Sequence, residues 1–181
     1  MMSQEKSEII VLKSKTGTYP SNFQRYIDEV KEDDLKTAFK NQMPAAEIFF
    51  QSIGEELSKR KYAEGKWTIK EVLQHVIDAE RVFGYRALCF ARKEEQPLPS
   101  FDENEYAVNS NANDRDWKEL VAEFSSVRKS TEYLYNSFST EAINAVGKAS
   151  DYTIGVSTLG FVIAGHVNHH IRIIQERYIG V

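Results

Sequence analysis

The feature that most constrains the fold of this 181-residue chain is a helical repeat of apolar residues in four separate stretches. In the first, from about residue 32 to 58, apolar side chains return every three or four positions. Pro44 stands inside this stretch, and we expect it to kink or interrupt the helix. Each stripe must bury its apolar face, so four of them predict an antiparallel four-helix bundle.

The second predicted helix begins at Thr68, because Thr68 and Glu71 have the spacing of a capping box. It runs to about Arg92, and Pro97 and Pro99 exclude its continuation. The long connection that follows is either a crossover between distant ends of two helices or a loop that covers a pocket. The sequence pattern alone leaves both open.

Asn113 or Asp114 is the expected cap of the third helix, whose apolar stripe ends at Phe138. A loop that contains two glycines then leads to the fourth predicted helix, from about residue 157 to 178. We find little sign of strands and no internal repeat.

Length and charge narrow the class of protein. A chain of 181 residues fits one domain, which we expect at residues 32–181, behind a polar, irregular N-terminal arm of residues 1–31. The net charge of −4 is spread along the chain and leaves no basic stripe of the kind that binds nucleic acid. No stretch approaches the roughly 18 apolar residues of a membrane-spanning helix. We therefore expect neither nucleic-acid nor membrane partners.

The single cysteine, Cys89, excludes an intrachain disulfide framework and any metal site built from several cysteines. It lies about 21 Å along the second helix axis from His75, so we expect it to have a packing role. A chain without disulfides fits a reducing compartment, and we expect a cytoplasmic protein.

All four histidines lie on two of the predicted helices. His166 and His170 are one turn apart and, at about 100° per residue, both lie near the centre of the apolar face of the fourth helix. His75 lies on the apolar face of the second helix, whereas His169 falls at the edge of its stripe. The pattern therefore directs three imidazoles into the core of the bundle.

Imidazoles buried among aliphatic side chains need polar partners, and charging them there is unfavourable. A divalent cation meets both conditions, because neutral imidazole nitrogen is a common metal ligand. Three protein ligands leave a position open for water or substrate, as in catalytic sites. The alternative is a set of hydrogen-bonded structural histidines without a metal. The absence of an HExxH motif excludes the metalloprotease arrangement.

Two stretches resemble a known family. GKWTIKEVLQHVIDAERVFGYRALCFARKEEQPLPSFDENEY (residues 65–106) and GHVNHHIRIIQERY (165–178) are similar, in order and separation, to the DinB/YfiT-like superfamily of small metalloproteins. The resemblance implies a four-helix bundle with a long crossover loop between its second and third helices. It also implies a metal near one end of the bundle, with His75, His166 and His170 as ligands and His169 outside the ligand set.

Known members of this superfamily include transferases and isomerases that use low-molecular-weight thiols, and others are named as metal-dependent hydrolases. The resemblance therefore implies a metal-dependent enzyme with a small-molecule substrate, either a hydrolase or a thiol S-transferase. A metal on three neutral histidines can activate water or hold a substrate thiolate. Zinc or nickel is expected, and iron, cobalt or copper is compatible. The competing hypothesis is a non-catalytic metal-binding protein of stress response or interaction.

Four further residues are candidates for a catalytic role. Asp78, three positions after His75, could orient an imidazole or accept a proton. Arg86 could neutralise an anionic substrate, and the loop FDENEY could bring Asp102 or Tyr106 over the metal. A solvated or salt-bridged role is the alternative for each. Bundles of this size often pair through a helix face, so we also expect a homodimer.

Overall fold

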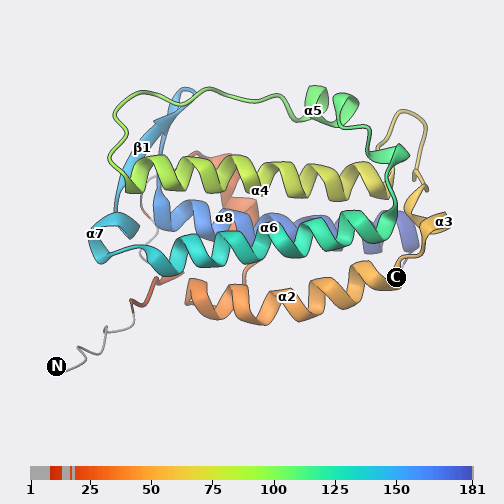
Figure 1. Ribbon diagram of the computed structural model, residues 1–181, viewed down its shortest axis with the longest axis horizontal. Coiled ribbons are helices and arrows are strands. Elements are labelled where there is room, and N and C mark those ends of the chain that lie inside the picture. Colours follow the sequence, from red (N-terminus) through yellow and green to blue (C-terminus); the bar gives the residue numbers. More distant parts are fainter. Residues whose placement is uncertain (1–8, 14–16, 18, 181) are drawn as a thin grey trace.

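The computed structural model describes residues 9–13, 17 and 19–180 and is a four-helix bundle (Figure 1). Its long helices are α2 (Leu35–Ser52), α4 (Ile69–Ala91), α6 (Trp117–Ser137) and α8 (Val156–Ile173). Helices α6 and α8 each pack against both α2 and α4. The predicted all-α four-helix bundle is confirmed. Within the described residues, no helix is long and apolar enough to cross a membrane.

Shorter elements connect and cover the bundle. They are η2 (Ser21–Phe23), α1 (Gln24–Ile27), α3 (Glu55–Ser58), α5 (Glu103–Asn109), η3 (Ala112–Asp114), α7 (Thr140–Ile143), β1 (Val146–Ala149), β2 (Tyr152–Gly155) and the π-helical η4 (Ile174–Ile179), which continues α8. The two strands form an antiparallel hairpin. The sequence pattern does not predict this hairpin, because four-residue strands are too short to show a clear alternation.

A long connection, residues 92–116, runs back along the outside of α4 and carries α5 (Figure 1). It returns the chain to the end of the bundle at which α4 begins, so α4 and α6 run parallel (Figure 1). The predicted crossover is therefore confirmed. The expected antiparallel order holds between α2 and α4 and between α6 and α8, but not across the crossover.

The capping box at the start of α4 is confirmed. The Thr68 hydroxyl accepts a hydrogen bond from the Glu71 amide (3.1 Å), and the Glu71 carboxylate accepts one from the Thr68 amide (2.7 Å). The predicted cap of the third helix is wrong, because Asp116 caps α6. Asn113 instead accepts a hydrogen bond from the Thr68 hydroxyl (2.7 Å), and Asp114 ends η3.

The first predicted helix is divided, but not at Pro44. Helix α2 continues through Pro44 and ends at Ser52, and the chain turns at Ile53 and Gly54 before α3 begins. Pro44 lies on the exposed face of α2, as does Lys40. The Lys40 carbonyl, which loses its helical partner to the proline, is therefore open to water, and the cost of the proline is reduced.

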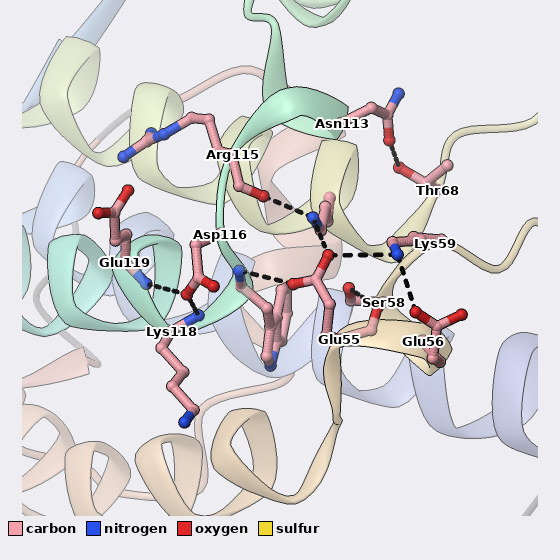
Figure 2. A network of polar contacts seen from close by, with 12 residues as sticks. Glu55, Glu56, Ser58, Lys59, Thr68, Asn113, Arg115, Asp116, Lys118 and Glu119 are labelled. Atoms are coloured by element: carbon pink, nitrogen blue, oxygen red, sulfur yellow. Dashed lines mark hydrogen bonds and ion pairs between the residues drawn. The ribbon is translucent and has the colours of Figure 1, made fainter.

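Polar contacts join α3 to the starts of α4 and α6 (Figure 2). The Glu55 carboxylate accepts hydrogen bonds from the ammonium group of Lys70 (2.5 Å) and from the Trp117 amide (2.9 Å). Lys70 is 1% exposed and also donates to the Arg115 carbonyl. A buried ammonium is tolerated only when it is paired in this way. The network fixes the end of the bundle from which α4 starts.

Two apolar clusters fill the bundle and meet at a layer of polar residues. Along α8, the first cluster ends at Ala164 and the second begins at Val167. Each of the other long helices also has one or two polar side chains within about one turn of the point where its residues of the two clusters meet. This polar layer contains Gln42, His75, Glu80, Arg128, His166 and His170.

Candidate metal centre

Three histidines converge where α4 faces α8. Nε2 of His166 lies 3.1 Å from Nε2 of His75 and 3.0 Å from Nε2 of His170. The three nitrogens suited to a metal all lie within 4.8 Å of one another. The structure thus brings together the residues that the helical pattern selected. Their role as metal ligands stays a prediction.

His169 points away from this cluster, toward Glu29 and Arg172. Its Nδ1 lies 3.9 Å from the Glu29 carboxylate and 3.3 Å from the Arg172 guanidinium. The same carboxylate accepts a hydrogen bond from Nε of Arg172 at 2.9 Å. His169 therefore belongs to a surface ion-pair group beside the cluster.

The hydrogen bonding of the cluster fits a divalent cation. The single lone pair on Nε2 of His166 accepts one well-aligned hydrogen bond, yet two imidazole nitrogens lie against it. Nδ1 of His170 is buried and has no hydrogen-bond partner among the described residues. Nitrogens bound at about 2.0–2.1 Å around a tetrahedral ion are separated by about 3.3 Å, close to the observed spacing. Shared ligation of an ion by the three Nε2 atoms would remove the conflict between them.

Burial keeps these histidines neutral. It lowers the pKa of His75 from 6.5 to about 4, with a smaller effect from the nearby His169. The pKa values of His166 and His170 are lowered well below 6.5, first by burial and then by the neighbouring imidazoles. Because only neutral imidazole has a free lone pair, the fold holds all three in the form that binds metal near neutral pH.

Aromatic rings surround the cluster. The Trp67 ring lies 5.0 Å from that of His75, and the Tyr26 ring lies 5.0 Å from that of His166. The Phe83 ring lies 6.2 Å from the His166 ring. The backbone of Trp67 is also fixed, because its carbonyl accepts a hydrogen bond from the Tyr178 hydroxyl at 2.9 Å. The site therefore has apolar walls and a polar centre, as small-molecule sites commonly do.

Tyr26 and its helix α1 are parts of the site that the sequence pattern misses. Helix α1 has only four residues, too few to show periodicity, and lies within the residues expected to form an arm. Gly165, beside His166, lets α1 approach, because a Cβ there would lie 1.7 Å from the Tyr26 carbonyl oxygen. A glycine next to an inward-facing histidine is the one sequence signal of this close approach. The boundary between residues 31 and 32 stays a prediction.

Two of the catalytic candidates lie together at one cavity. Asp78 and Tyr106 line a cavity of about 420 Å³ between α4 and α5. The Asp78 carboxylate accepts a hydrogen bond from the Gln74 amide (2.9 Å) and lies 3.7 Å from the Arg81 guanidinium. Burial raises the pKa of Asp78, partly offset by these contacts.

The other two candidates hold the crossover in place. Arg86 is buried and donates hydrogen bonds to the Tyr152 hydroxyl and the Pro99 carbonyl, both at 2.9 Å. Asp102 caps α5, accepting from the amide of Asn104 at 2.8 Å. Among the described residues, none of the four candidates has a hydrogen bond or ring contact to the three histidines. A catalytic role for any of them stays a prediction.

Comparison with known proteins assigns the family. The model of the DinB superfamily matches residues 22–174. The chain belongs to the DinB superfamily. The matched region contains α1, the crossover and all three histidines of the cluster.

Two relatives are similar over different lengths of the chain. A protein of Oceanobacillus iheyensis with the provisional name metal-dependent hydrolase is 37% identical over 60 residues, 33% of this chain and 34% of its own length. The solved structure of YfiT from Bacillus subtilis, described as a probable metal-dependent hydrolase with an unusual four-helix bundle topology, superimposes with a TM-score of 0.65. It is 15% identical, with 88% of this chain and 87% of YfiT covered, and supports the shared fold.

Proposed function

We propose that this DinB superfamily protein is a metal-dependent enzyme that binds a divalent ion through His75, His166 and His170 and acts on a small molecule. The observation that carries the proposal is the convergence of three neutral imidazoles, one buried and two partly buried, on one point, with Nε2 separations of 3.1 and 3.0 Å and no carboxylate among them. The names of the two relatives add support, since both refer to metal-dependent hydrolases. Zinc or nickel suits three imidazoles best, and iron, cobalt or copper is compatible.

When bound, such an ion supplies Lewis-acid chemistry, either for hydrolysis by water or for transfer of a low-molecular-weight thiol to an electrophile. The residues of the chain hold and shield that centre. Trp67, Tyr26 and Phe83 limit the water around the imidazoles. Because the pKa of each imidazole is low, protons do not compete with the metal for its nitrogen near neutral pH. Asp78, which lines the cavity between α4 and α5, is our candidate to accept a proton from the substrate.

The activity is tested with protein stripped by a chelator and reloaded with zinc or nickel. One assay measures hydrolysis of a chromogenic ester, and the other measures conjugation of glutathione or cysteine to 1-chloro-2,4-dinitrobenzene. We expect one activity to return with the metal and to be absent from a His75→Ala variant. Cys89→Ala serves as the matched control and should retain the activity, because a reacting thiol would arrive as substrate.

The rival function is a metal-binding protein of stress response or interaction without catalysis. It is favoured if zinc or nickel binds and raises the thermal unfolding midpoint while neither ester cleavage nor thiol conjugation is detected. Absence of metal binding by the wild-type protein would contradict both hypotheses.

We also infer a cytoplasmic homodimer. Tyr85 and Leu88, one turn apart on α4, are 58% and 37% exposed, and such an apolar pair is a candidate contact between copies. Light scattering should give twice the chain mass of 20.8 kDa. A mass of one chain at micromolar concentration would contradict the dimer.

A further inference from the structure

Helix α1 carries a cation to the edge of the histidine cluster. The Arg25 guanidinium donates a hydrogen bond to the Tyr26 hydroxyl at 2.6 Å and lies 4.6 Å from the centre of the Tyr26 ring. The same ring meets His166 at 5.0 Å and His169 at 5.4 Å, in both cases at nearly right angles. Tyr26 thus contacts both the guanidinium of Arg25 and the rings of His166 and His169.

The position of α1 is fixed by contacts with α8. Gly165 admits the Tyr26 backbone, and the Asn168 side chain donates a hydrogen bond to the Glu29 carbonyl at 2.9 Å. The Glu29 carboxylate in turn lies 2.8 Å from the Arg172 guanidinium. Arg25 therefore occupies a defined place beside the cluster, although its own side chain is exposed.

Arg25 has no acidic partner among the described residues. The nearby carboxylates on its own segment are engaged elsewhere, since Asp28 accepts a hydrogen bond from Gln24 (2.7 Å) and Glu29 from Arg172. Four other arginines, Arg81, Arg115, Arg128 and Arg172, are each paired with a carboxylate, whereas Arg177, like Arg25, lies over a tyrosine ring, 5.6 Å from that of Tyr62.

A metal on three neutral imidazoles would keep its full positive charge, and Arg25 adds another beside the Tyr26 ring that contacts His166. We propose that Arg25 binds a carboxylate of the substrate while another atom of the same molecule reaches the centre formed by His75, His166 and His170. A guanidinium presents parallel N–H donors that match the two oxygens of a carboxylate. This inference rests on the proposed function and adds the substrate class, a small carboxylate-bearing molecule.

The test uses cobalt-substituted protein and two ligands of the same shape, 3-mercaptopropionate and 3-mercaptopropionamide. Binding of each is followed through the visible absorption of cobalt. For each protein, the ratio of the two dissociation constants measures the preference for the carboxylate ligand over the amide. The ratio for the wild type is then divided by the ratio for Arg25→Gln. Differences in thiol acidity or chelation between the two ligands cancel in this quotient. We expect a loss of carboxylate preference of about fivefold, the upper range for an exposed ion pair.

Two further variants separate substrate binding from simpler effects. Tyr26→Phe removes the hydrogen bond to Arg25 but keeps the ring, and should reduce the preference by a smaller factor. Lys129→Gln is the control for net charge, because Lys129 also carries a positive charge over a tyrosine, 5.1 Å from the Tyr133 ring on α6. This variant should leave the ratio of the two dissociation constants unchanged.

The outcomes distinguish this inference from the one on which it rests. Cobalt and thiol binding with an unchanged ratio in Arg25→Gln would overturn the role of Arg25 and leave the metal centre standing. An equal loss in Lys129→Gln would also overturn it, since net charge alone would then explain the effect. If the wild-type protein does not bind cobalt, both the metal centre and the role of Arg25 are contradicted. If the cobalt-loaded protein binds neither thiol, the role of Arg25 is overturned but the metal centre stands.

Discussion

Glu80 and Arg128 lie in the same polar layer as the histidine cluster, but the two groups differ in how their polar atoms are satisfied. The Arg128 guanidinium donates hydrogen bonds to both Glu80 oxygens, at 2.8 and 2.9 Å, and a third to the Gln42 side chain. Charges and donors balance within the chain. The imidazoles of His75, His166 and His170 lack such a balance, because Nε2 of His166 faces the Nε2 atoms of both other rings.

This difference indicates which buried polar groups are candidates to bind an ion or a ligand from outside the chain. A group that completes its own hydrogen bonds is explained by the fold, and its removal changes stability. A group whose lone pairs converge without enough donors is a candidate site for a bound ion. The predictions below test this contrast between the ion-pair half and the histidine half of the layer.

The largest effect is expected in the ion-pair half. Arg128→Met leaves Glu80 buried without its partner, and the free energy of unfolding should fall by about 3–5 kcal/mol. Urea denaturation measures this. The double variant with Glu80→Leu should recover most of the loss, because no charge is then left buried. A single variant that loses less than about 1 kcal/mol would show that the pair is not satisfied in the way described.

The second effect belongs to the histidine half and appears in metal affinity. His166→Ala removes the central nitrogen and should weaken zinc or nickel binding at least about 100-fold, since loss of outer partners alone costs 10- to 100-fold. Competition with a chromogenic chelator measures the affinity. His169→Ala is the matched control and should bind metal nearly as wild type does. Equal affinities for the two variants would contradict the proposed ligand set.

A smaller effect is expected from pH in the metal-free protein. Because burial lowers the pKa of His75 from 6.5 to about 4, the unfolded chain binds a proton between these values that the folded chain excludes. The free energy of unfolding should therefore fall as the pH drops, by about 2 kcal/mol between pH 7 and 5 for this residue. His166 and His170 act in the same direction.

Urea unfolding at several pH values checks this prediction. Three acidic groups have lowered pKa values, namely Glu55, Glu123 and Glu141. Their contribution to the free energy of unfolding is lost only below about pH 4.5, outside the pH range of this experiment. A His75→Gln variant should flatten the dependence. Stability that is constant or rises toward pH 5 would contradict the burial of neutral imidazoles.

The smallest effect concerns the docking of α1. Gly165→Ala places a Cβ against the Tyr26 carbonyl, so the backbone must shift, at a cost of about 1–2 kcal/mol. Gly84→Ala is the matched control, because a Cβ there meets nothing within 4 Å and should stabilise α4 by up to about 1 kcal/mol. Thermal unfolding compares the two. Similar melting temperatures would mean that α1 does not lie against α8.

Helical periodicity could predict the bundle and the convergence of the histidines, because long stripes specify which side chains face inward. The capping box of Thr68 and Glu71 predicted the N-cap residue of α4 correctly. The cap of α6 could not be chosen so well, because Asn113, Asp114 and Asp116 are all suitable caps close together. Only the tertiary contact of Asn113 with Thr68 decides among them.

The remainder depends on contacts between distant, short segments. Nothing in residues 24–27 distinguishes α1 from an irregular arm, and only the packing of Tyr26 against α8 gives it a place in the site. Arg86 and Asp102, predicted from residue type, have structural contacts within the crossover, and their catalytic role stays a prediction. Sequence spacing locates residues on a helix face, but does not state which loop covers that face.

The most direct measurement of the central claim is an anomalous difference map from crystals of metal-loaded protein, with data collected on both sides of the zinc or nickel absorption edge. The account predicts one strong peak within bonding distance of Nε2 of His75, His166 and His170. A map with no peak among these three nitrogens, from protein shown to contain the metal, would contradict it.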